Sequence, residues 1–272
     1  MAFLELGPED ALFYEWTPPS RDGAASFVFV NPITGDVSLW NDSVVPALIA
    51  KGFGVLTYNF RGQAQSRYAA DTSLNDSLIT SDLIALLKHI EPPRAILTGL
   101  SIGGLYAARA YLSGVPISGM VLLNTLRRIT PRIAWMNDAT LRVMQVGGPN
   151  LMKDLYFHLL LGENFTGAER EKFLVDSPDY QPLSSDSGAY NLLTWMGESN
   201  WDVDWSKLAL PVLVVTGLQD RVFYDAAIVD ELYAQLPDAR RIDIPSAGHM
   251  LPQEAPSELS TALLEFGHSI KA

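Results

Sequence analysis

The segment GLSIG, residues 99–103, contains the residue with the clearest chemical potential in this chain. Ser101 lies between the apolar run RAILT and the alanine-rich run IGGLYAARAYL, which predict a strand followed by a helix. A sharp strand-to-helix turn of this kind presents a serine hydroxyl as a nucleophile, and Gly99 and Gly103 leave room for its tight backbone. A serine that only caps the helix is the alternative interpretation.

A nucleophilic serine needs a histidine base, because its hydroxyl is weakly reactive at neutral pH. His249 follows the predicted strand 239–245 and is the candidate base. The other three histidines lie on predicted helices or in an insertion and are interpreted as surface or packing residues; they are His89, His158 and His268.

The base in turn needs an acid that orients it. Asp220 follows the predicted strand 211–217 and is the candidate acid. Another position for the acid, at the end of the strand 119–124, holds Asn124, whose amide cannot accept as a carboxylate would. The sequence therefore predicts Ser101, Asp220 and His249 as catalytic residues.

Short apolar runs alternate with longer helical patterns along the chain, which predicts an α/β fold, a mostly parallel sheet flanked by helices. The runs AFLEL and ALFYEW, separated by GPED, predict an antiparallel hairpin at the N-terminus. The remaining predicted strands are 26–30, 53–60, 94–99, 119–124, 211–217 and 239–245, and the predicted helices are 38–50, 74–90, 101–113, 223–236 and 256–269.

A long interval separates the strands 119–124 and 211–217, where a strand–helix–strand unit needs only about 30 residues. We therefore expect a core domain of residues 1–125 and 206–272 and a helical cap insertion of residues 126–205. This insertion holds four of the six tryptophans and four of the seven methionines, side chains that suit a lid over an apolar ligand. Packing of the insertion onto the core is the alternative.

Two groups of side chains in the insertion are candidates for substrate contacts. Trp135 and Trp195, each followed by a methionine, are candidates for the pocket wall. Four arginines are candidates for binding a substrate carboxylate, namely Arg127, Arg128, Arg132 and Arg142. A solvated helix face that pairs with acidic residues is the alternative for the arginines.

Composition sets broader limits on function. The chain of 272 residues is 48% hydrophobic, enough for one catalytic domain with an insertion. Its net charge of −12 is spread along the sequence and argues against nucleic acid and membrane partners. We find neither a run of about 18 apolar residues nor the pattern of a signal peptide, and expect a cytoplasmic monomer or homodimer. The absence of cysteine excludes disulfides and thiolate metal sites, and we expect no metal or cofactor.

Several motifs together resemble those of the α/β-hydrolase superfamily, and the resemblance covers nearly the whole chain. These motifs are GLSIGG, TGLQDRV and SAGHMLPQEAP, in the order serine, acid, histidine, together with FRGQAQS, which is similar to the RGxGxS turn with Ala64 in place of the usual glycine. The segment VNPITGDVSLW departs from the usual His-Gly and is similar to the form found in 3-oxoadipate enol-lactonases and related bacterial esterases. The resemblance implies the fold and a serine hydrolase activity, but no particular substrate.

The resemblance also implies an oxyanion hole built from two backbone amides. One belongs to Ile102, the residue after the nucleophile, and the other to the loop after the strand 26–30. Pro32 has no N–H, so the matching position implies Ile33 as the second donor.

These residues together predict a serine hydrolase that cleaves a small-molecule carboxylic ester or lactone through an acyl-enzyme intermediate. The alternatives are an acyltransferase, a perhydrolase or a C–C bond hydrolase of the same fold, and a non-catalytic ligand receptor.

Overall fold

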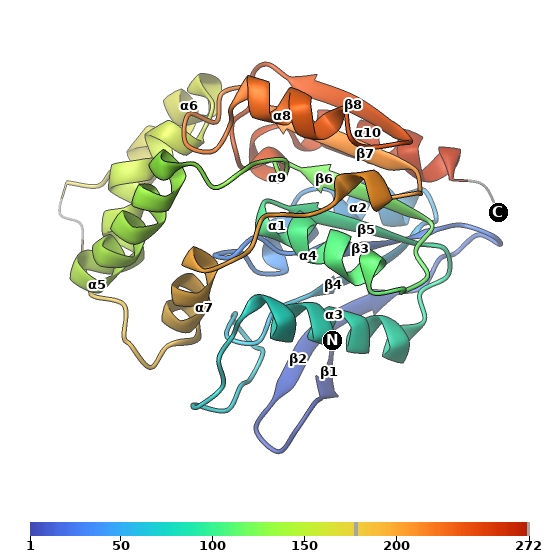
Figure 1. Cartoon of the computed structure of the whole chain (residues 1–272), viewed down its shortest axis with the longest axis horizontal. Coiled ribbons are helices and arrows are strands. Elements are labelled where there is room, and N and C mark those ends of the chain that lie inside the picture. Colours follow the sequence, from blue (N-terminus) through green and yellow to red (C-terminus); the bar gives the residue numbers. More distant parts are fainter. Residues whose placement is uncertain (177–178, 271–272) are drawn as a thin grey trace.

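The computed structural model describes residues 1–176 and 179–270. Residues 177–178, within the predicted insertion, and 271–272, at the end of the predicted core domain, lie outside the described residues. Within the described ranges, eight strands form one sheet in the order β1-β2-β4-β3-β5-β6-β7-β8 (Figure 1).

The sheet is parallel except at its N-terminal edge. The pairs β1–β2 and β2–β4 are antiparallel, and all the other neighbouring pairs are parallel, as the sequence predicts. Every residue of the five strands from β3 to β7 is buried, which explains their near-continuous hydrophobicity. The strands are β1 (Ala2–Glu5), β2 (Ala11–Thr17), β3 (Ser26–Val30), β4 (Gly54–Tyr58), β5 (Ala95–Leu100), β6 (Gly119–Leu123), β7 (Val212–Gly217) and β8 (Ala239–Ile244).

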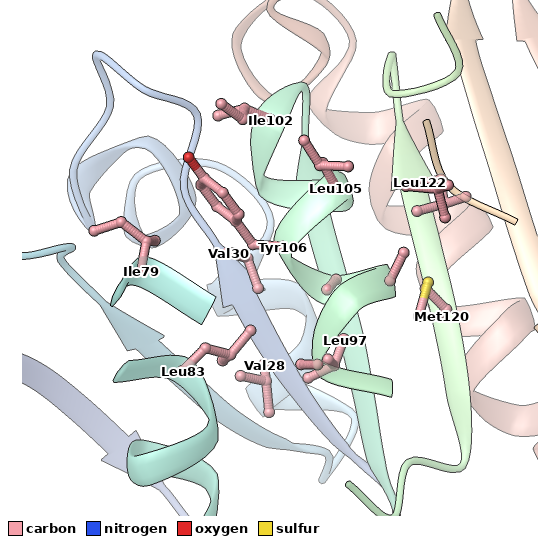
Figure 2. Packing of buried hydrophobic residues seen from close by; sticks show 14 of the residues in the cluster. Val28, Val30, Ile79, Leu83, Leu97, Ile102, Leu105, Tyr106, Met120 and Leu122 are labelled. Atoms are coloured by element: carbon pink, nitrogen blue, oxygen red, sulfur yellow. The ribbon is translucent and has the colours of Figure 1, made fainter. Parts of the chain in front are cut away.

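Helices cover both faces of this sheet. One face packs against α3 (Asp76–Ile90), α4 (Ile102–Leu112) and α8 (Ala226–Tyr233). The other face packs against α1 (Ser38–Asn41), α2 (Val45–Ala50), α9 (Leu251–Glu254) and α10 (Pro256–Ser269). Figure 2 shows the first layer, in which side chains of α3 and α4 lie over β3, β5 and β6.

The prediction of one continuous helix over residues 38–50 is wrong, because two short helices, α1 and α2, occupy this segment. Pro46 causes the break: it has no N–H to donate to the preceding turn, and it fits only near the start of α2. The short helix α9, directly after the candidate base, was not predicted from the sequence.

The long interval between β6 and β7 holds three helices, α5 (Pro131–Leu160), α6 (Glu163–Phe173) and α7 (Gly188–Gly197), followed by the 3₁₀ helix η1 (Trp205–Lys207). Figure 1 shows α5, α6 and α7 together on one side of the molecule. Gly148, with φ of 64°, precedes Pro149 and kinks α5. None of the helices in residues 1–176 and 179–270 combines the length and apolar character that a bilayer crossing requires.

Candidate active site

Ser101 lies at a strained turn between β5 and α4. Its φ of 58° and ψ of −122° are unusual for a residue with a side chain, and this turn exposes the hydroxyl where the strand ends. A Cβ at Gly99 would lie 2.3 Å from the Gly103 carbonyl carbon, and one at Gly103 would lie 2.2 Å from the Val30 oxygen. The Ser101 side chain makes no capping hydrogen bond to a described amide of α4, which argues against the simple helix-cap interpretation.

Asp220 and His249 meet as a buried pair. The His249 Nδ1 lies 2.6 Å from Asp220 Oδ2, while Asp220 Oδ1 accepts from the amides of Val222 and Phe223 at 2.9 Å each. Burial, the largest influence, raises the pKa of Asp220, but His249, the Phe223 amide and the Arg127 charge together bring that pKa below its usual value. The ionised carboxylate thus favours the His249 tautomer that carries its proton on Nδ1 and leaves Nε2 as the acceptor.

Asn124 holds the loop that carries His249. Its Nδ2 donates to the carbonyl oxygens of Gly248 and His249, at 3.0 and 2.9 Å, and its Oδ1 accepts from the Gly217 amide at 2.8 Å. From the sequence, Asn124 was notable only because it occupies a position where a catalytic acid could stand. Its amide instead joins the end of β7 to the histidine loop.

Glu254 supports the same loop from the other side. Its Oε2 accepts from the amides of Gly162 and Gly248, at 2.6 and 2.8 Å, and its Oε1 accepts from the Met250 amide at 2.8 Å. The carboxylate therefore binds the backbone on both sides of His249 and ties it to the end of the inserted helices. Glu254 lies within the segment SAGHMLPQEAP, but nothing in that segment predicts these contacts.

The two predicted oxyanion-hole amides border one cavity with the serine. Ile33 and Ile102 both line it, and among the described residues neither backbone N–H donates a hydrogen bond. The loop at Ile33 is held by Gln63, whose Nε2 donates to the oxygens of Pro32 and Ile33 at 2.9 and 3.1 Å. Both amides are therefore free to donate to a substrate oxygen.

This cavity has a volume of about 340 Å³, and Ser101 and His249 share its wall. Helices α5 and α7 supply much of the remaining wall, through Ile133, Met136, Met152, Phe157, Leu193 and Met196. The histidines excluded on sequence grounds, His89, His158 and His268, are exposed and do not line it.

Neither of the two tryptophans predicted for the pocket wall lines this cavity. Trp135 is 78% exposed, and Trp195 is half-buried against the core. Their neighbours Met136 and Met196 line the cavity instead. Successive residues on a helix point about 100° apart, so an error of one position moves a side chain off the wall.

One of the four candidate arginines reaches the site. Arg127 is buried, lines the cavity and donates from Nη2 to Ser101 Oγ at 2.6 Å and to the Asn124 oxygen at 3.1 Å. The other three are exposed: Arg128 pairs with Glu231, Arg132 contacts a backbone oxygen, and Arg142 lies on α5. Within the described residues, no cluster of three His, Asp or Glu side chains is arranged to bind a metal ion.

Comparisons with known proteins show the family and the fold of the chain. Residues 27–262 match the model of a family described as the alpha/beta hydrolase family. The chain is 27% identical to "Putative non-heme bromoperoxidase BpoC" of Mycobacterium tuberculosis, over 90% of this chain and 94% of that one. It is also 27% identical to 3-oxoadipate enol-lactonase 2 of Acinetobacter baylyi, over 72% of each chain. Among solved structures, an alpha/beta hydrolase enzyme from a Medee basin deep-sea metagenome library has a TM-score of 0.83 at 19% identity, covering 100% and 98% of the two chains.

Proposed function

Because this chain belongs to the α/β-hydrolase family, we propose that it is a serine hydrolase that cleaves small carboxylic esters or lactones through an acyl-enzyme intermediate. The observation that carries the proposal is the shared cavity, in which the strained Ser101 and the Asp220-paired His249 border two free amides. The relative named 3-oxoadipate enol-lactonase 2 supports the same reaction class.

In the proposed mechanism, His249 Nε2 removes the proton of Ser101 as Oγ attacks the substrate carbonyl carbon. The amides of Ile33 and Ile102 donate to the oxyanion that forms, and Asp220 stabilises the imidazolium. The tetrahedral intermediate expels the alkoxide, which takes the proton from His249. Water, deprotonated by the same base, then releases the acid and restores Ser101.

The first step requires the Ser101 hydroxyl to change partners. Among the described residues its side-chain hydrogen bond is with Arg127 rather than with His249. The hydroxyl must therefore leave Arg127 and approach the imidazole, a change that is compatible with an apo site whose catalytic hydrogen bonds form only with substrate bound.

Steady-state hydrolysis of p-nitrophenyl butyrate tests the proposal. Ser101→Ala should lower kcat/KM by more than about 1000-fold without changing the circular dichroism spectrum, because it removes the nucleophile and little else. Ser38→Ala is the matched control, since Ser38 lines the same cavity and has no proposed role. A Ser101→Ala variant that keeps more than a few per cent of the wild-type rate would contradict the proposal.

Perhydrolysis is a second candidate, favoured by the similarity to the relative named as a bromoperoxidase. Hydrogen peroxide would replace water as the acceptor of the acyl group, so that a peracid leaves and Ser101 is regenerated. Product analysis with ethyl acetate and peroxide separates the two activities. Peracid as the main product would favour perhydrolysis, and acetate as the main product would favour hydrolysis.

A further inference from the structure

We propose that Arg127 binds a carboxylate of the substrate, so that the preferred substrates are acidic esters or lactones whose carboxylate lies only a few bonds from the reacting carbonyl. This inference rests on the proposed hydrolase function and narrows its substrate class. Arg127 lines the cavity and donates to the nucleophile.

Arg127 has hydrogen-bond donors that no described residue uses. Its Nε is buried without a partner, and its Nη1 makes no hydrogen bond to a described residue. No carboxylate oxygen of a described residue lies within 4.0 Å of the guanidinium nitrogens, so Arg127 forms no ion pair there. Burial lowers the pKa of Arg127 to about 10, although the negative charge of Asp220 raises it in part. The guanidinium therefore remains a cation at neutral pH. Asp220 acts on this charge without pairing with it directly, and a buried cation without a directly paired carboxylate is unfavourable, so an incoming carboxylate would relieve it.

Two aromatic rings hold this guanidinium in place. Its Cζ lies 4.4 Å from the ring centroid of Trp201 and 4.4 Å from that of Phe223. Phe223 also packs against His249, with ring centroids 4.9 Å apart. The rings compensate for part of the lost hydration through cation–π attraction, but they accept none of its in-plane N–H groups. The guanidinium is thus fixed next to the catalytic pair with its hydrogen-bonding edge incompletely used.

The charges of the other wall residues leave Arg127 as the group that would bind an anion. It is the one Lys or Arg side chain in the described part of the chain that lines this cavity. The other charged wall residue, Asp36, belongs to the loop near Ile33, where its Oδ1 accepts from the Ser38 amide at 2.8 Å. A carboxylate that enters the site therefore has a single cationic partner, and a neutral substrate leaves that partner unsatisfied.

The contact with the nucleophile limits the length of the substrate. Nη2 is 2.6 Å from Oγ, which attacks the carbonyl carbon after it turns toward His249 and which stays on the same Cβ as it turns. A reacting carbonyl approaches its nucleophile to about 3–3.5 Å, and a carboxylate oxygen lies about 2.7–2.9 Å from the guanidinium nitrogen that binds it. The carboxylate must therefore be close to the carbonyl, as in malonate, succinate or glutarate monoesters, and a longer adipate chain would have to fold back.

A pair of matched esters tests the inference on the wild-type enzyme. Monoethyl succinate and ethyl succinamate have the same shape, but the first carries a carboxylate where the second carries a neutral amide. We expect kcat/KM to favour the acid by about 10- to 100-fold, the range that hydrogen bonds to charged groups supply. Equal or lower kcat/KM for the acid would overturn the inference even if both esters are hydrolysed.

Variants assign the preference to a residue. Arg127→Met should abolish the preference for the acid, so that kcat/KM becomes similar for the two esters. Arg127→Lys should retain part of the preference. Arg128→Met is the matched control, because Arg128 is exposed and paired with Glu231, and its ratio should equal that of the wild type. A proportional loss on both esters in Arg127→Met would show that Arg127 acts on Ser101 rather than on the substrate, which would overturn the inference.

The position of the carboxylate is resolved by two further substrates. Monoethyl succinate places it on the acyl side of the ester, and 3-acetoxypropanoate places it on the alcohol side. The acyl-side preference should depend on Arg127 and should fall from monoethyl succinate to monoethyl adipate, and 3-acetoxypropanoate shows whether a carboxylate on the alcohol side is recognised as well. A preference that increases with chain length would contradict the contact geometry.

A binding measurement separates this inference from the hydrolase proposal. In Ser101→Ala the hydroxyl that occupies Nη2 is absent, so calorimetry should show succinate binding at least as tightly as to the wild type. The double variant Ser101→Ala with Arg127→Met should lose this binding by about 10-fold or more. An equal affinity for succinate in Ser101→Ala and in the double variant would refute the anion site. Esterase activity in Ser101→Ala would refute the hydrolase mechanism alone.

Discussion

Glu254 offers a sharp test of how the histidine loop is held, through the change Glu254→Gln. The carboxylate accepts three backbone N–H groups, at 2.6, 2.8 and 2.8 Å, and two of them flank His249. A glutamine amide has one acceptor oxygen, so it can keep at most the two bonds made by Oε2. Its NH₂ then faces the Met250 N–H, donor to donor.

The size of the effect follows from these contacts. Hydrogen bonds to charged groups contribute about 1.5–3 kcal/mol each, and the glutamine loses one and weakens two, which gives a destabilisation of about 2–4 kcal/mol. For a chain of this size that corresponds to a fall in Tm of roughly 5–15 °C. Because the His249 backbone would shift, kcat should fall by about 10-fold or more on every ester alike.

Thermal melts and p-nitrophenyl butyrate kinetics measure both effects. Glu258→Gln is the matched control, since this exposed glutamate lies in the first turn of α10 and its loss should change stability by no more than about 1 kcal/mol. A Glu254→Gln variant with the Tm and kcat of the wild type would refute the view that this carboxylate positions His249.

Three further outcomes are expected. The acid limb of log kcat/KM against pH should have a slope of one, because the lowered pKa keeps Asp220 ionised over this range and leaves a single catalytic group to be protonated; a slope of two would contradict this. Met136→Ala should shift ester preference toward longer acyl chains, while Trp135→Ala should leave chain-length profiles unchanged. Ala64→Gly should raise Tm by about 1–4 °C, because Ala64 has a φ of 39°; a lower Tm would argue against backbone strain there.

The sheet and the positions of the catalytic candidates were predictable for a common physical reason. Strands buried on both faces form continuous apolar runs, so their ends are visible in the sequence. Ser101, Asp220 and His249 follow the ends of β5, β7 and β8, and parallel strands bring such ends to one edge of the sheet. Their catalytic roles remain predictions.

The supporting contacts were not predictable, because they depend on how loops meet in space. Asn124, Gln63 and Glu254 act on backbone groups that are remote in sequence or hidden in turns. Gln63 and Glu254 lie within quoted motifs, but a motif does not indicate which backbone groups its side chains meet. Arg127 and Arg128 are adjacent and chemically identical, yet one is buried beside Ser101 and the other is exposed. Only the path of the chain after β6 distinguishes them.

The central claim, that Ser101 is the nucleophile of an acyl-transfer reaction, is tested most directly by covalent labelling. The protein is treated with a fluorophosphonate, digested and analysed by mass spectrometry while the remaining esterase activity is followed. We predict one adduct, on Ser101, that forms in step with the loss of activity and at a greatly reduced rate in His249→Gln. Complete loss of activity with the adduct on another residue and Ser101 unmodified would contradict the account.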